Sequence, residues 1–380
     1  MATKKHLIFI FIILILNPLI NTSFQLSLFN HLNSKYQEKN LIISPLSIYQ
    51  AISLVTNGAV GQTQKELLTF LDNKEMEEIN SMNLRILNKI QHNSALEIAN
   101  AIMSKLSPLY DFTQIAKKNF NSEILPLKSA KQINKWCDKK THGKINHIID
   151  ELDPLTYMII LNAVYFKGEW VYHFNKDLTK KETFYNQNKF ESKVDMMEIT
   201  KHFKYFSDSN LQSIELPFIK ETITALIILP NKNIGINEFI ELLSKDNEYL
   251  YTIADNMKTS KVNLRLPKFE LTYNKSLKDV LKSMGVNLPF DVNAVFSNIR
   301  RQNDIFINDI IHKTYLKVNE DGTEAAAVTM VEMMFNSFMP REEKIIDMEV
   351  NRPFLFLLKN SRFPEGYDMV FMAKIEEIKN

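Results

Sequence analysis

Val318-Asn319-Glu320-Asp321-Gly322-Thr323-Glu324-Ala325-Ala326-Ala327-Val328-Thr329, near the C-terminal end, joins a turn to a run of small and β-branched residues. The residues of one parity, from Thr323 to Thr329, carry no charge, whereas the other parity includes Glu324. Alternation with a period of two is typical of a strand with one buried and one solvated face. The side chains on the uncharged face are small, which predicts a segment that can insert between strands already packed together.

The residues that follow this run carry side chains that a protease pocket accepts. They are Met333-Met334-Phe335-Asn336-Ser337-Phe338-Met339-Pro340-Arg341. A strand that continues into a cleavage site predicts a bait loop, which inserts into a sheet once a protease has cut it.

This run and eight further segments in the same order closely resemble the serpin family, over nearly the whole mature chain. The further segments are 40–48, 57–63, 133–136 with 141–145, 161–170, 215–218, 266–269, 312–313 and 351–354. Each segment alone is a weak signal, and the matching order of all eight makes accidental similarity a poor explanation. The run 318–329 is similar to the hinge of the serpin reactive-centre loop.

The fold class expected from the pattern is α+β. Helical spacing over 46–55 follows Ser44-Pro45, a favourable helix start, and Gly58 is expected to end the helix. The stretch 158–166 is apolar on both parities, which predicts a central strand covered on both faces. The resemblance implies the serpin fold: three β-sheets including a large central sheet A, eight or nine helices, and an exposed reactive-centre loop at about 320–345.

Composition limits the function. The 380 residues carry a formal net charge of +2, so no global charge favours nucleic acid as a partner. We find no motif of a hydrolase elbow, zinc site or phosphate loop, and we expect neither an enzyme nor a cofactor or metal. Cys137 is the only cysteine, and we expect it to be a buried structural thiol rather than a nucleophile.

The N-terminal segment predicts secretion. Lys4 and Lys5 precede a ten-residue apolar run at 7–16, as in a signal peptide, and we assign 1–22 to the signal and 23–380 to a single serpin domain. An uncleaved anchor is the alternative. We expect a secreted, extracellular protein without membrane contact after cleavage, and Asn21 and Asn274 fit the glycosylation pattern.

The resemblance also assigns roles to polar residues elsewhere in the chain. The shutter, which lets the central strands part and reclose, is assigned to Ser44, Ser47, Asn162 and His312. The breach, at the point of loop entry, is assigned to a pair formed by Lys268 and Glu320. The simpler alternatives are that the shutter residues are ordinary satisfied core polars and that the breach residues are solvated surface charges.

The hinge residues predict an inhibitory rather than a non-inhibitory member of the family. The hinge comprises Glu320, Gly322, Thr323, Glu324, Ala325, Ala326, Ala327, Val328 and Thr329. Neither proline nor charge interrupts its uncharged face, although Val328 is bulkier than the family's usual residue. The resemblance implies a monomeric serine-type endopeptidase inhibitor that traps its target protease as a covalent acyl-enzyme. The alternative is a non-inhibitory serpin acting as a carrier, chaperone or secreted signal.

The family's spacing from Glu320 places the scissile bond at Asn336-Ser337, which suits an asparaginyl endopeptidase. Cleavage after Phe335 suits chymotrypsin-like or cathepsin G-like enzymes, and cleavage after Met334 suits elastase-like enzymes. Further options are Phe338, Met339 and, for a trypsin-like enzyme, Arg341.

Overall fold

The apolar segment predicted as a central strand is the middle of a five-stranded sheet in the computed structural model, which describes residues 24–72, 74–90, 95–187, 190–219, 222–323 and 343–379. The strand order is β10-β11-β4-β2-β3. The strands are β10 (Phe269–Ser276), β11 (Asp309–Val318), β4 (Met158–Phe166), β2 (Leu96–Ser104) and β3 (Glu123–Pro126). The pair β4–β11 is parallel, whereas β11 is antiparallel to β10 and β4 is antiparallel to β2.

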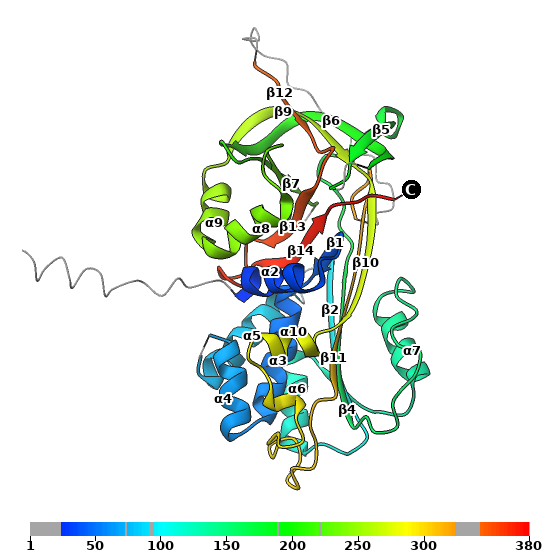
Figure 1. Cartoon of the computed structure of the whole chain (residues 1–380), viewed down its shortest axis with the longest axis vertical. Helices are drawn as coiled ribbons and strands as arrows, with labels where there is room; N and C mark the ends of the chain where they lie inside the picture. The colour runs from blue at the N-terminus through cyan, green and yellow to red at the C-terminus, as the bar shows by residue number, and fades with distance from the viewer. Residues whose placement is uncertain are drawn as a thin grey trace, which may run out of the picture.

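All nine residues of β4 are buried, because helices cover both faces of this sheet. Residues of odd number, such as Leu161 and Tyr165, pack with Trp136 and Cys137 of α7 (Ala130–Lys140). Residues of even number, such as Val164, face the main core. Figure 1 shows α7 alone on one side of the sheet, with α3, α5, α6 and α10 on the other.

A second network of nine strands follows the order β1-β14-β13-β8-β7-β6-β9-β12, with β5 paired to β6. The resemblance implies three sheets, but the 17-residue β6 pairs β5 over its first part and β7 over its last part, which joins two of them. The bounds are β1 (Asn40–Ile43), β5 (Lys180–Tyr185), β6 (Glu191–Ser207), β7 (Leu211–Pro217), β8 (Ile223–Pro230), β9 (Lys258–Pro267), β12 (Ile346–Glu349), β13 (Phe354–Asn360) and β14 (Met369–Ile375).

The described residues form nine α-helices, which agrees with the expected eight or nine. Besides α7 they are α2 (Phe24–Tyr36), α3 (Pro45–Gly58), α4 (Gly61–Phe70), α5 (Met76–Ile90), α6 (Tyr110–Phe120), α8 (Ile236–Lys245), α9 (Asn247–Asp255) and α10 (Lys278–Ser283). The predicted start and end of α3 are confirmed: Ser44 caps its first turn and Gly58 is its last residue. Gly58 also leaves space for Ile299, which a Cβ atom would approach to 2.2 Å.

Candidate functional site

The predicted loop leaves β11 through a tight turn. The side-chain Oδ1 of Asn319 accepts hydrogen bonds from the backbone N–H groups of Asp321 and Gly322, both at 3.1 Å. Gly322 has a φ of +136°, and a Cβ atom there would lie 2.2 Å from the carbonyl oxygen of Gly168. Only glycine fits this position, because it tolerates both the backbone angle and the close approach.

The residue after the turn is already docked on the end of β4. The backbone N–H of Thr323 donates to the carbonyl of Gly168 at 2.7 Å, and the Gly168 N–H donates to the Thr323 hydroxyl at 2.6 Å. Gly322 and Glu169 form an antiparallel bridge. Thr323 is fully buried. The first residues of the hinge therefore run antiparallel to β4 at the top of the sheet.

Three further contacts hold the turn against the segment that follows β4. The backbone N–H of Trp170 donates to the carbonyl of Asp321 at 3.1 Å, and the N–H of Phe174 donates to the carbonyl of Glu320 at 3.0 Å. The indole N–H of Trp170 donates to the carbonyl of Asn319 at 3.0 Å. Backbone groups of consecutive residues are satisfied here by one partner segment, so the turn is fixed in place.

Glu320 and Lys268, the predicted breach pair, meet at 3.1 Å. The Glu320 side chain is 7% exposed and that of Lys268 is 35% exposed, so the carboxylate is nearly buried. Burial alone would raise the pKa of Glu320, but hydrogen bonds from its own backbone, from Thr179 and from Lys268 outweigh it and lower the pKa. The alternative of two solvated surface charges is wrong for Glu320.

A second ion pair anchors the same turn. The carboxylate of Asp321 lies 2.8 Å from the Nζ of Lys176 and 3.9 Å from His173. The hydrogen bond to Asp321 and its negative charge raise the pKa of Lys176. Consecutive acidic residues thus bind cations from two different segments, Lys268 before β10 and Lys176 after β4.

The parallel pairing of β4 and β11 ends just below this turn. The register runs from Asp309 opposite Ile159 to Tyr315 opposite Tyr165. In the described part of the chain, β11 continues to Val318 without a further partner in β4. Pairing between the two central strands therefore ends three residues before the end of β11, just below the turn that begins the hinge.

A buried polar layer joins the same strands halfway down. Asn100 of β2, Asn162 of β4 and His312 of β11 lie opposite one another in register. Asn162 donates to the Oδ1 of Asn100 at 2.6 Å and to the backbone carbonyl of Ser47 at 3.1 Å. The hydroxyl of Ser47 donates to the Oδ1 of Asn162 at 2.7 Å.

The hydrogen bonds of His312 fix its protonation state. Its Nε2 accepts the backbone N–H of Ser44 at 3.1 Å and must be unprotonated. Its Nδ1 lies 2.5 Å from the Oδ1 of Asn162 and therefore carries the proton. Complete burial lowers the pKa of His312 to about 3. The layer is satisfied by a neutral histidine in one tautomer.

A family model described as "Serpin (serine protease inhibitor)" matches residues 19–376. The chain belongs to the serpin family. It is 31% identical over 359 residues to the intracellular coagulation inhibitor 2 of Tachypleus tridentatus, covering 90% of this chain and 86% of that protein. The native structure of the thermophilic serpin tengpin matches with a TM-score of 0.83 at 27% identity, covering 94% of this chain and 93% of that one.

The crystal structure of human thyroxine-binding globulin also has this fold, with a TM-score of 0.83 at 25% identity, covering 95% of this chain and 98% of that one. The predicted α+β serpin fold is confirmed. Within the described residues, no helix is long and apolar enough to cross a membrane.

The serpin site brings together most of the predicted residues that the structure describes. The four shutter residues share one hydrogen-bonded layer, and Glu320, Gly322 and Thr323 meet the end of β4. Asn274 is exposed on β10 and donates to the carbonyl of Ile148 at 2.9 Å. The remaining hinge residues, all the scissile-bond candidates, the predicted signal segment 1–22 and Asn21 lie outside the described residues.

Cys137 is buried on α7, as predicted. Burial raises the pKa of its thiol to about 12, and the nearby Lys313 only partly offsets this increase. A thiol with so high a pKa is protonated at neutral pH and a poor nucleophile.

Sequence reasoning missed Asn100 in the shutter and Thr179 and Lys176 at the breach. Asn100 is a polar residue with apolar residues on both sides of it in β2, which was an available signal. Lys176 and Thr179 lie in the connection after β4, where no spacing in the sequence relates them to the turn. Only the folded positions of Asp321 and Glu320 reveal these partners.

Proposed function

We propose that this serpin is a secreted endopeptidase inhibitor that acts by cleavage of its reactive-centre loop, acyl-enzyme trapping and loop insertion between β4 and β11. The observation that best supports this proposal is the direction in which the chain runs at the hinge. The turn at 319–322 reverses the chain, so a strand continuing from Thr323 runs antiparallel to β11 and to the parallel β4. Such a strand can pair with both neighbours beyond the point where their own pairing ends.

The reaction uses the catalytic groups of the target. The protease nucleophile attacks the carbonyl of the scissile residue, the peptide bond breaks, and the new amino terminus leaves while an acyl ester or thioester remains. Insertion then carries the tethered protease away from the hinge. Displacement of the protease's catalytic groups by an ångström is enough to slow deacylation strongly.

The length of the loop supports this mechanism. From Thr323 to Asn336, fourteen residues in extended conformation span roughly 45 Å at about 3.3 Å per residue. The ten residues of β11 occupy roughly 33 Å by the same spacing. A fully inserted strand is therefore long enough to reach the far end of the sheet, with roughly 12 Å to spare.

The scissile bond is proposed at Asn336-Ser337, with Met334, Phe335 and Phe338 as alternatives. An asparaginyl endopeptidase matches the first position, and elastase-like or chymotrypsin-like enzymes match the alternatives. Removal of the segment 1–22 during secretion would bring the inhibitor into contact with extracellular targets.

The test is formation of a covalent adduct. The purified mature chain is incubated with elastase, cathepsin G, chymotrypsin, trypsin and an asparaginyl endopeptidase, then run on denaturing gels, and the released peptide is sequenced. We expect an adduct resistant to heat and detergent with one enzyme. The variant Thr323→Arg should be cleaved without adduct because a charge enters the buried face, whereas Thr323→Ser, which keeps the hydroxyl that accepts the Gly168 N–H, should retain inhibition. Unchanged inhibition by Thr323→Arg contradicts the assignment of this face.

A non-inhibitory carrier is the second candidate, and its support is the likeness to thyroxine-binding globulin. Heat stability before and after cleavage of the loop separates the two functions. An inserting serpin gains a central strand, and its thermal midpoint should rise by tens of degrees. A non-inhibitory carrier would show neither a rise of the thermal midpoint after cleavage nor a covalent adduct.

A further inference from the structure

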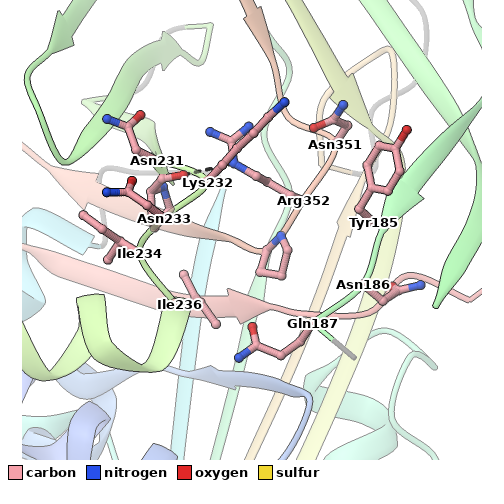
Figure 2. A pocket seen from close by; sticks show the side chains of 13 residues that line it. Tyr185, Asn186, Gln187, Asn231, Lys232, Asn233, Ile234, Ile236, Asn351 and Arg352 are labelled. Atoms are coloured by element: carbon pink, nitrogen blue, oxygen red, sulfur yellow. Dashed lines mark hydrogen bonds between the residues drawn. The ribbon is translucent and has the colours of Figure 1, made fainter. Parts of the chain in front are cut away.

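A pocket of about 480 Å³ lies away from the hinge and the shutter. Three segments form it: the end of β5 with its following turn, the β8–α8 connection, and the chain between β12 and β13 (Figure 2). Its lining includes Lys232, Ile234, Ile236, Arg352 and Pro353. The volume is within the range of small-molecule sites in proteins.

The lining has a distinct chemistry. The described residues that line it include two cations, Lys232 and Arg352, and several side-chain amides, and none of them is an aspartate or glutamate. In Figure 2 the side chains of Lys232 and Arg352 lie between Asn231 and Asn233 on one side and Tyr185 on the other. Two positive charges in a concave site whose described lining carries no acidic side chain, together with several hydrogen-bond donors, favour an anionic ligand.

Arg352 is the better-placed of the two cations. Its Nε donates to the carbonyl of Pro230 at 3.0 Å, which fixes the guanidinium at the pocket wall. No carboxylate among the described residues forms an ion pair with it, since the nearby Glu349 is paired to Arg265 at 3.2 Å. Within the described part of the chain, the two terminal nitrogens of this half-buried guanidinium have no hydrogen-bond partner, which suits bidentate binding of a carboxylate or sulfate.

The start of α8 adds to the positive potential. Gly235 precedes this ten-residue helix and gives it no side-chain cap, so the first N–H groups of the helix lack that partner. Gly235 and Ile236 both line the pocket. The helix start supports the assignment, which rests on the cavity and its two cations.

We propose that this pocket binds a small amphiphilic anion, with its carboxylate or sulfate group on Arg352 and Lys232 and its apolar body against Ile234, Ile236 and Pro353. Such a ligand connects three segments that are distant in the sequence. One of them, Asn351 to Pro353, follows β12 and is tied to β5 by the bond from the Tyr185 N–H to the Asn351 carbonyl at 2.8 Å. Binding therefore stabilises the native arrangement of this part of the fold.

The experiment uses the full mature chain with naphthalene-2-sulfonate as the anionic probe and 2-naphthalenemethanol as its neutral counterpart. Binding is measured by isothermal titration calorimetry and by the shift of the thermal midpoint. We expect saturable binding of the sulfonate and little binding of the alcohol. Arg352→Gln should weaken sulfonate binding at least tenfold and Lys232→Gln several-fold. Lys282→Gln, which removes an exposed lysine on α10, should bind the probe as the wild type does.

The outcomes separate clearly. Equal sulfonate binding by all three variants and the wild type, equal binding of alcohol and sulfonate, or no saturable binding of the sulfonate would each overturn the proposal. Lys232 is exposed, so Lys232→Gln should fold normally and tests the site even if loss of the Arg352 bond to Pro230 destabilises the chain. The outcome is independent of protease inhibition, because the pocket shares no residue with the hinge or the shutter.

Discussion

Acidification is expected to destabilise the native serpin through His312. The neutral imidazole accepts the backbone N–H of Ser44 and donates to Asn162, so a second ring proton would face the Ser44 N–H and break that bond. Because burial lowers the native pKa to about 3, below the ordinary value of 6.5, the unfolded state binds a proton that the native state does not. The stabilisation is complete above pH 6.5 and is lost progressively as the pH falls toward 3.

The size of the effect follows from the difference between the two pKa values. Each pH unit between 6.5 and 3 costs about 1.4 kcal/mol of unfolding free energy. The loss due to His312 alone is therefore about 1.4 kcal/mol at pH 5.5 and about 2.7 kcal/mol at pH 4.5. Since His312 is fully buried, solvent does not screen this contribution.

The assay is the urea midpoint of the first unfolding transition, measured at pH 7.5, 6.5, 5.5 and 4.5. His312→Gln should be less stable at pH 7.5 but should lose little more on acidification. His147→Gln removes an exposed histidine that pairs with Asp150 and should keep the wild-type pH dependence. The reasoning is refuted if His312→Gln and the wild type lose the same free energy between pH 6.5 and 4.5.

Two other substitutions test the turn. Gly322→Ala should lower the thermal midpoint far more than Gly366→Ala, because both have positive φ but only the first Cβ meets backbone atoms, and equal shifts would contradict this. Glu320→Gln should destabilise the native state by about 1.5–3 kcal/mol at neutral pH, the loss of a charge-assisted hydrogen bond. Because the pKa of Glu320 is lowered, its stabilisation is present at neutral pH and lost on acidification, so the denaturant midpoints of wild type and variant should converge once the pH falls below this lowered pKa.

Most of the fold was predictable because its signals are local or ordered along the chain. The apolar run of β4 and the Ser44-Pro45 start of α3 each specify an element without reference to the rest of the molecule. The shutter and the Lys268–Glu320 pair were predictable only through the family resemblance. Their partners are far apart in sequence, and no spacing rule connects residue 44 with His312.

Other features could not be predicted because they depend on tertiary position. The bridge of Gly322 to Glu169 and the pairing of Asp321 with Lys176 require the path of the chain after β4. The burial of Thr323 in the native state was also not predicted. The alternating pattern indicates which face becomes buried, but not whether it is buried before the loop is cut. The joining of two expected sheets depends on the length and bend of β6.

The docked turn also predicts the register of the inserted strand. Gly322 is opposite Glu169, and Thr323 bonds to Gly168, so the residue numbers in each opposed pair sum to 491. Continuing this antiparallel register down β4 brings Thr329 opposite Asn162. Directly opposed residues in an antiparallel pair point to the same face. Thr329 would therefore enter the shutter layer.

The proposed insertion would move β4 and β11 from one strand spacing apart, about 4.8 Å, to about twice that distance, which would break the bond between His312 and Asn162. The Thr329 hydroxyl can donate to one and accept from the other, which re-satisfies both buried groups. Thr329→Val keeps the shape but leaves them unpaired, at a cost of about 1–3 kcal/mol in the inserted state only.

For Thr329→Val we expect a lower thermal midpoint of the cleaved form, an unchanged midpoint of the native form and more substrate-like turnover. Val331→Thr is the matched control, because it makes the reverse exchange of methyl and hydroxyl at the next position of the same face, away from the shutter layer. Adding Val331→Thr to Thr329→Val should not restore the thermal midpoint of the cleaved form, because the new hydroxyl cannot bond His312 and Asn162. An unchanged midpoint of the cleaved Thr329→Val variant would show that the register in the inserted form differs from the one that the native turn begins.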